Sequence, residues 1–381
     1  MKLKLFILST LQYLLLTSQG EGQIQASEPA FDLDQFLSLY NSTFLLDDDG
    51  PSSAPCHVNV PGFSGLGLTI TYIIVFVFSM VGNSIVVYVV CCMKQGRAST
   101  DIYLMHLAVA DLLFCLTLPF WAVDVHSGWI FGNFMCKLLS GFQEASVYSG
   151  VFLLACISVD RYFAIVRATR ILSSHHLLVK VVCGVVWLVA GLLSLPVAIQ
   201  RESFAAEDLG QTICFENLTG NSGDQWRVSM RILRHTMGFF LPLVVMTVCY
   251  SWTVVTLFHT RSQQKHKAMR VILAVVLAFI LCWLPYNVTV LIDTLIQGGS
   301  SEVCDTRYRV EVMLNVTQVL AFTHCAVNPV LYAFIGEKFR NQLLLALYKH
   351  GLISKRLLMA YRKSSVSSVG SIRSRNTSIT M

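Results

Sequence analysis

The chain has 381 residues, of which 54% are hydrophobic and 13% are charged, and its mean hydropathy is +0.61. A water-soluble domain of this composition could not cover its apolar surface, so the composition predicts a polytopic membrane protein. The net charge is +6, and the charged residues are unevenly distributed along the chain. We expect no nucleic-acid partner for a membrane protein of this kind.

Seven apolar stretches are each long enough to cross a hydrocarbon core, which needs about 20 helical residues. They occupy residues 66–92, 102–123, 133–159, 178–199, 235–258, 271–296 and 310–335. The predicted fold class is therefore an all-α membrane protein, a seven-transmembrane helix bundle over 66–335. An odd number of spans places the two termini on opposite sides of the membrane.

The N-terminal 65 residues divide into a leader and an acidic segment. Residues 1–20 begin with two lysines, continue with a short apolar stretch and end in small polar residues, which is the layout of a signal peptide. An eighth span is the alternative, but its apolar part is too short. Residues 21–65 contain seven acidic residues and no Lys or Arg, so this segment would attract a basic partner.

Basic residues cluster between the first two spans, after the third span, before the sixth span and in the tail, all on one side of the membrane. This distribution predicts an extracellular N-terminus and a cytoplasmic C-terminus. On the outer side, Asn41 and Asn217 begin glycosylation sequons, and Tyr40 is a candidate for sulfation. Only four of the twelve cysteines map outside the cell, and four cysteines allow three pairings. These four are Cys56, Cys136, Cys214 and Cys304.

The C-terminal part is predicted to leave the bundle along the membrane. Residues 336–350 have the pattern of an amphipathic helix on the inner leaflet, a contact with membrane lipid. No cysteine follows Cys325, which excludes a palmitoyl anchor there. Residues 351–381 are rich in Ser and Thr, and phosphorylation would give this tail dense negative charge.

Polar and charged residues inside the spans mark candidate functional positions, because charge at membrane depth is costly. Asn83 and Asp111, in the first two spans, should face each other or water inside the bundle. Asp160, Arg161 and Tyr162 end the third span, where the aspartate neutralises the arginine. The alternative for Arg161 is an ordinary snorkelling arginine at a helix end.

Several motifs resemble those of one receptor family. Asp160-Arg161-Tyr162, Cys282-Trp283-Leu284-Pro285 and Asn328-Pro329-Val330-Leu331-Tyr332 resemble signatures of rhodopsin-like G-protein-coupled receptors. Thr117-Leu118-Pro119 and Lys265-His266-Lys267-Ala268-Met269-Arg270 are similar to chemokine receptor motifs, in particular those of the interleukin-8-type CXC chemokine receptors, types 1 and 2. The resemblance runs from about Cys56 to Lys355.

The resemblance implies two disulfides, Cys136–Cys214 and Cys56–Cys304, and a set of residues that switch during activation. Those residues are Asp111, Asp160, Arg161, Tyr162, Tyr250, Trp283, Pro285, Asn328, Pro329 and Tyr332. Asp111 resembles the acid of a family sodium site, but Ser146 and Gly150 depart from that site, so bound Na⁺ is in doubt. No other cofactor and no metal centre is expected.

The implied ligand is a basic chemokine at the plasma membrane. Arg227, Arg231 and Arg234 recur at helical spacing and suit a carboxylate-bearing ligand. Asp293 and Glu311 give the same pocket both signs of charge, whereas Gln318 departs from an acid common in chemokine receptors. The implied intracellular partners are an inhibitory-class heterotrimeric G protein, receptor kinases and arrestin, in leukocyte chemotaxis.

Parts of the sequence are also compatible with other functions. A receptor of the same fold could serve another chemokine or peptide, or scavenge chemokines without signalling. An intramembrane serine protease is suggested by Gly62-Phe63-Ser64-Gly65 and His324. However, His324 lies roughly 24 Å deeper than Ser64 at the helical rise, too far for a nucleophile and its base. We therefore predict that the chain is not an enzyme.

Overall fold

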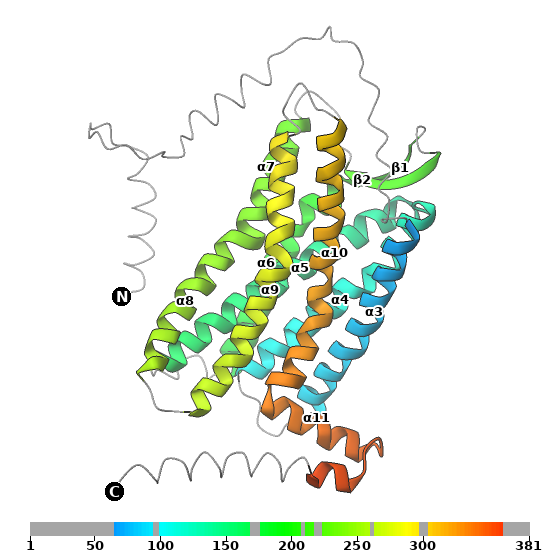
Figure 1. Cartoon of the computed structure of the whole chain (residues 1–381). Coiled ribbons are helices and arrows are strands. Elements are labelled where there is room, and N and C mark those ends of the chain that lie inside the picture. Colours follow the sequence, from blue (N-terminus) through cyan, green and yellow to red (C-terminus); the bar gives the residue numbers. More distant parts are fainter. Residues whose placement is uncertain are drawn as a thin grey trace, which may run out of the picture. The chain divides into compact units, whose positions relative to one another are not determined.

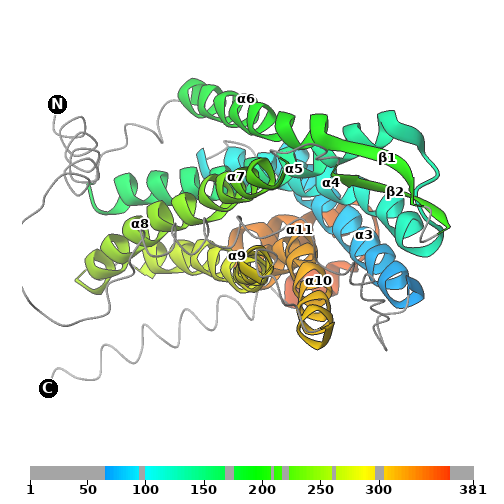
Figure 2. The ribbon, with the colours of Figure 1, turned by 90° about the horizontal axis from the view of Figure 1, so that it is seen from above.

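A computed structural model of the chain describes residues 65–93, 99–167, 176–206, 210–216, 223–259, 263–296 and 304–360. These residues form a bundle of long, roughly parallel helices (Figure 1, and Figure 2 from above). A small β-hairpin lies at one end of the bundle and helix α11 lies at the other (Figure 1). The leader, the acidic segment with Tyr40, Asn41 and Cys56, the sequon at Asn217 and the tail from residue 361 lie outside the described residues.

The elements follow the chain in simple order. The first half contains α3 (Gly65–Tyr88), η1 (Val89–Met93), α4 (Ser99–Ser127), α5 (Gly132–Ile165), α6 (His176–Gln200), β1 (Arg201–Ala206) and β2 (Gln211–Glu216). The second half contains α7 (Gly223–His235), η3 (Thr236–Phe240), α8 (Leu241–Phe258), α9 (Gln263–Ile296), α10 (Cys304–Ile335) and α11 (Glu337–Lys349). The elements η1 and η3 are single π-helical segments, and β1 pairs with β2 in an antiparallel hairpin.

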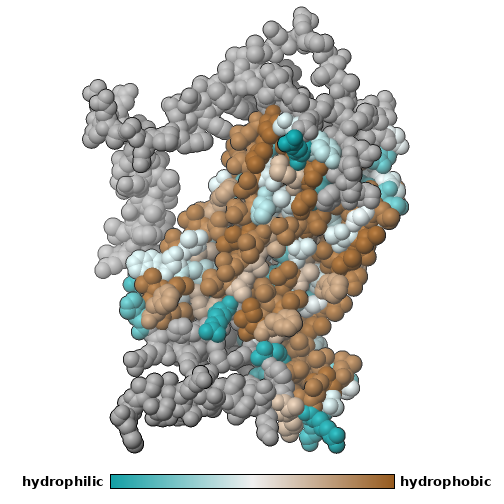
Figure 3. Space-filling view, viewed as in Figure 1, coloured by the Kyte–Doolittle hydropathy of each residue, from teal (hydrophilic) through white to brown (hydrophobic). Residues whose placement is uncertain are grey.

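Seven helices in the described part of the chain are long and apolar enough to cross a membrane, which confirms the predicted fold class. They are Gly65–Cys92, Ser99–Ser127, Gly132–Ile165, Leu177–Gln200, Val228–Phe258, Ile272–Ile296 and Tyr308–Ile335. Several extend past the apolar stretches, because polar residues continue the helices beyond the hydrocarbon core. Apolar side chains such as Phe78 and Leu188, 68% and 64% exposed, cover the sides of the bundle (Figure 3).

The disulfide between Cys136 and Cys214 joins the start of α5 to β2, with Cα atoms 5.7 Å apart. Beside it, Trp129 is buried and its backbone N–H donates to the Thr212 carbonyl at 2.7 Å. The first predicted pairing is thus confirmed, and it fixes the hairpin over the helix ends. The pairing of Cys56 with Cys304 stays a prediction.

Helices α3 and α10 approach each other closely at Gly82 and Pro329. A Cβ atom at Gly82 would lie 2.8 Å from Cγ of Pro329. Pro329 has no backbone N–H, so the carbonyl of Cys325, four residues earlier, has no helical donor. The side chain of Asn83 fills this role, because its Nδ2 donates to the Cys325 carbonyl at 2.9 Å. Gly82 therefore allows α3 to satisfy the backbone group that Pro329 leaves free.

This contact predicts that Gly82→Ala destabilises the protein by about 1–3 kcal/mol, because the added methyl group must displace Pro329. Gly191→Ala on α6 is the control, since nothing lies within 4 Å of the added methyl group. The control should be neutral or stabilise by up to about 1 kcal/mol, as alanine favours the helix. Thermal unfolding of the purified variants measures both. Equal stability of the two variants would contradict the close approach.

Candidate functional site

A cavity of about 250 Å³ opens at the hairpin end of the bundle, between the helix ends and the two strands. Its lining consists of Tyr72, Trp121, Asp124, Val125, Ser140, Gln143, Glu144, Val197, Arg201, Cys214, Arg234, Gln318 and Phe322. Most of these side chains are polar or aromatic, so the cavity offers hydrogen-bonding groups and aromatic surface to a ligand.

Five buried polar atoms in this lining have no hydrogen-bond partner within the described residues. They are Nε1 of Trp121, Oδ1 of Asp124, Oγ of Ser140, Nε2 of Gln143 and Nε of Arg201. Buried polar groups are normally paired, so clustered exceptions indicate a place where another molecule completes the hydrogen bonds. The cavity thus offers both donors and acceptors to a ligand.

Two ion pairs near the cavity connect α7 to other helices. Arg234 contacts Glu144 of α5 at 2.6 Å, and the Glu144 side chain is only 4% exposed. Arg231 contacts Asp293 of α9 at 3.0 Å and also donates to Thr294 at 2.9 Å. Both arginines therefore have an acidic partner within the protein, whereas the sequence predicted a basic stripe suited to a carboxylate of the ligand.

The other predicted ligand residues do not form one cluster. Gln318 lines the cavity, and its Nε2 donates to the hydroxyl of Tyr72 at 3.3 Å. Glu311 is exposed on α10. Arg227 lies on α7, but its side chain falls outside the described residues. Of the predicted ligand residues, Gln318 therefore lines the cavity, Arg231 and Asp293 form an ion pair outside its lining, and Glu311 is exposed on α10.

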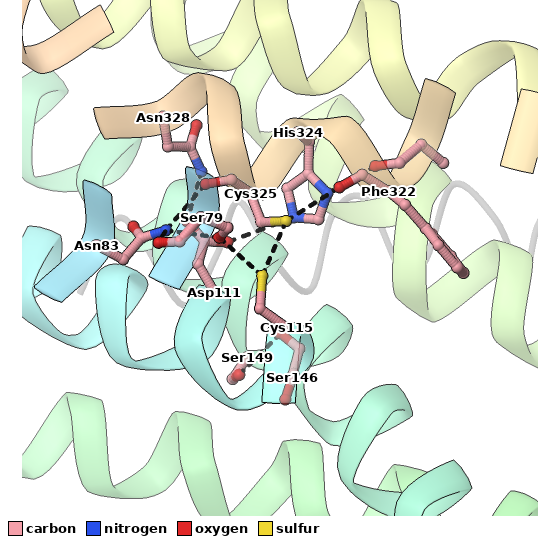
Figure 4. A network of polar contacts seen from close by, with 11 residues as sticks. Ser79, Asn83, Asp111, Cys115, Ser146, Ser149, Phe322, His324, Cys325 and Asn328 are labelled. Carbon is pink, nitrogen blue, oxygen red and sulfur yellow. Dashed lines mark hydrogen bonds and ion pairs between the residues drawn. The ribbon is translucent and has the colours of Figure 1, made fainter. Parts of the chain in front are cut away.

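A second group of polar residues lies deeper, between α3, α4 and α10 (Figure 4). Asp111 is 3% exposed and accepts a hydrogen bond from Nδ2 of Asn328 at 2.8 Å. Its second oxygen lies 3.4 Å from Nε2 of His324. Asn83 belongs to the same network, but it bonds to Ser79 and the Cys325 carbonyl rather than directly to Asp111. We call these residues the central network.

Aromatic rings surround the imidazole of His324 on its other sides. Trp283 lies 5.3 Å away between ring centroids, and Phe114 lies 5.6 Å away. Trp283 is also connected upward, because its carbonyl accepts from Nδ2 of Asn287, whose Oδ1 is 2.6 Å from Nδ1 of His235. The central network is thus in contact with side chains that approach the cavity.

At the opposite end of the bundle from the hairpin, Arg161 bonds to its neighbour Asp160. The distances from Oδ2 are 3.1 Å to Nε and 2.5 Å to Nη2, and Asp160 is almost fully buried. Tyr250 and Tyr332 are buried with hydroxyl groups that have no hydrogen-bond partner among the described residues. The sequence from 261 to 270 has no acid that could hold Arg161 from the base of α9.

Comparison with known proteins decides the family. Residues 82–332 match the model of the 7 transmembrane receptor (rhodopsin family). The chain belongs to the rhodopsin family of seven-transmembrane receptors. It is 47% identical to "C-X-C chemokine receptor type 2" of Homo sapiens over 320 residues, 83% of this chain and 87% of the relative. It is also 47% identical to "C-X-C chemokine receptor type 1" of Pan troglodytes over 322 residues, 84% of this chain and 91% of the relative.

The family assignment makes the chain a multi-pass receptor of the plasma membrane and not an enzyme. His324, the base of the protease hypothesis, instead contacts Asp111 inside the bundle. Two contacts were not predicted from the sequence. They are the ion pair of Glu144 with Arg234 and the contact of His324 with Asp111. Glu144 and His324 are ionisable groups within apolar stretches, and that signal could have found them.

The family's sodium site does not fit the residues of this receptor. A hard cation needs several oxygen ligands, but both oxygens of Asp111 face Asn328 and His324. Ser146 and Ser149 donate to carbonyls of their own helix, and Gly150 has no side-chain oxygen. A cavity of about 10 Å³ lies beside these residues, and apart from His324 and Asn328 its lining is apolar or aromatic. It therefore supplies few oxygen ligands for a cation.

Replacing sodium chloride with choline chloride should therefore leave the thermal unfolding temperature of this receptor unchanged, because only a bound ion stabilises the folded state. His324→Ser removes the imidazole and supplies a hydroxyl beside Asp111. This variant should unfold at a lower temperature and gain a dependence on sodium. Stabilisation of the unmodified receptor by sodium would show that the imidazole does not replace the ion.

The Glu144–Arg234 pair predicts unequal effects of its two single variants. Arg234→Gln leaves a buried carboxylate unpaired and should cost about 3–5 kcal/mol. Glu144→Gln leaves an arginine whose side chain is 38% exposed and can reach water, so it should cost about 1 kcal/mol. Thermal unfolding of both variants and of the double variant measures the coupling. Additive effects in this cycle would show that the two side chains do not interact.

Proposed function

We propose that this receptor binds a basic CXC chemokine of the interleukin-8 type and signals through an inhibitory-class G protein. The names of the similar receptors support the ligand class. The acidic segment 21–65, which has no Lys or Arg, supports a first contact with a basic protein. In this proposal the N-terminal segment is extracellular and the tail is cytoplasmic.

The observation that carries the proposal is that α7 is joined to other helices by two ion pairs, Arg234–Glu144 in the lining of the cavity and Arg231–Asp293 outside that lining. The N-terminus of a chemokine that carries both an acid and a base can bind Arg231 and Asp293 in place of their mutual contact. The same exchange is available at Arg234 and Glu144. Because these pairs hold α7 to α9 and α5, a ligand that exchanges them has different affinities for different helix arrangements. Such a difference is what shifts a conformational equilibrium.

The remaining steps lie along the bundle. A rotation of α9 at Pro285 moves Trp283, which packs against His324 of the central network. Outward movement of the base of α9 then frees Arg161 from Asp160, and Tyr250 and Tyr332 supply hydroxyl groups to it. The G protein binds the cleft that this movement opens. Receptor kinases and arrestin act later on the Ser- and Thr-rich tail, and the cellular outcome is chemotaxis.

A panel of chemokines applied to cells that express the chain tests the proposal, with inhibition of cyclic-AMP formation as the readout. Chemokines with an acidic residue near the N-terminus should give the strongest response. Arg161→Ala should keep chemokine binding and lose the cyclic-AMP response, because binding and G-protein contact lie at opposite ends of the bundle. Lys180→Ala, exposed on α6, is the control and should respond normally.

Three results would contradict the proposal in different ways. Chemokine binding without any cyclic-AMP response would indicate a scavenging receptor. A response to other peptides alone would indicate another receptor of the same fold. Full signalling by Arg161→Ala would remove this arginine from the switch.

A further inference from the structure

After α11 the chain turns back and forms a second short helix before the tail begins. The turn contains Gly351 at φ 74°, and the N–H groups of Gly351 and Leu352 donate to the carbonyls of Tyr348 and Leu347. These bonds are the standard glycine end of an α-helix. Oγ of Ser354 then accepts from the N–H of Leu357 at 3.3 Å and caps the helix of residues 355–360. The sequence thus specifies this turn and helix.

The turn is attached to the bundle at the level where the first span ends. The hydroxyl of Tyr88 lies 2.7 Å from Nε2 of His350, and the two rings are 5.6 Å apart. Tyr88 precedes the end of this span, Cys92, by four residues, which is about 6 Å of helix. The segment that follows α11 is therefore held near the depth of the lipid headgroups.

Three large apolar side chains of this segment are exposed although they lie outside the spans. Leu352 is 71% exposed, Leu357 is 56% exposed and Met359 is 54% exposed, whereas Leu358 is buried. Together with Tyr348 of α11, which is 40% exposed, they form an apolar surface at the end of the bundle opposite the hairpin. Surfaces of this kind mark a binding site for lipid or protein.

The same segment is strongly basic. Lys349, Lys355 and Arg356 are exposed, and no Asp or Glu follows Glu337 in the sequence. Nine basic residues follow Glu337, and all lie in the part of the chain after the last span. A basic and apolar segment next to a span complements an acidic membrane surface in both charge and polarity.

We propose that residues 349–360 are a docking surface for the acidic lipids of the adjoining leaflet. Leu352, Leu357 and Met359 enter the headgroup region, and Lys349, Lys355 and Arg356 bind the negative headgroups. One acyl chain alone anchors a protein weakly, and basic patches commonly supply the second attachment. Here the exposed basic residues and the exposed apolar residues lie in the same short segment and supply both attachments. This surface is independent of the identity of the extracellular ligand.

Hydrogen exchange of the full chain in lipid nanodiscs tests the proposal. One set of nanodiscs contains phosphatidylcholine alone, and the other also contains phosphatidylserine. Amide exchange in residues 350–360 should be slower with phosphatidylserine, by about fivefold for each basic residue engaged. Exchange in α3–α10 should be the same in both lipids, which shows that the bundle is unchanged.

Two variants and a control separate charge from apolar contact. Lys355→Glu combined with Arg356→Glu should abolish the difference between the lipids. Arg270→Glu, exposed on α9, reverses a charge elsewhere and should preserve the difference. Leu352→Ser combined with Met359→Ser should speed exchange in both lipids.

Equal exchange of the unmodified receptor in the two lipids would overturn the proposal. It would also be overturned if protection in either lipid required an added soluble acidic protein, because the occupant would then be a protein.

Discussion

The arrangement of this bundle depends on one missing hydrogen bond at Pro329. At membrane depth no water is available to the Cys325 carbonyl that the proline leaves without a donor. Asn83 supplies the donor from α3, and the absence of a side chain at Gly82 lets the two helices approach closely enough. The residue before the proline, Asn328, bonds to Asp111 of α4. A single Asn-Pro step therefore holds three helices together, and the same step is the family's signature in the last span.

The two ion pairs of α7 also join polar groups of different helices, but their main effect concerns the positions of the helices rather than stability. A buried ion pair gives little net stability compared with apolar side chains, yet loss of one partner is costly. Glu144 with Arg234 and Asp293 with Arg231 therefore make the positions of α5, α7 and α9 sensitive to any molecule that brings competing charges. The cavity beside them provides further unpaired donors and acceptors for such a molecule. Stability and responsiveness thus arise from the same charged side chains.

The apolar stretches alone were sufficient to predict the seven spans, because their length and polarity leave few alternatives. The residues that occupy costly positions were also visible, since a charge at membrane depth stands out in any sequence. Their partners were not, because a partner depends on which face each helix turns inward. Arg231 and Arg234 were therefore predicted only as part of a basic stripe, and neither the Glu144–Arg234 pair nor the contact of His324 with Asp111 was predicted. Periodicity places a residue on its own helix but not against another.

The position of the restraints is consistent with the proposed control from the hairpin end. Among the described residues, Arg161 is held by Asp160 of its own helix, so this pair does not tie α5 to the base of α9. Polar contacts that cross between helices are present in the cavity lining and in the central network. His235, Asn287, Trp283 and His324 form a continuous series of contacts between these two levels. Proximity alone does not prove coupling. In the proposed function, the helices therefore rearrange when contacts between them change, and the Glu144–Arg234 pair in the cavity lining is within reach of the proposed ligand.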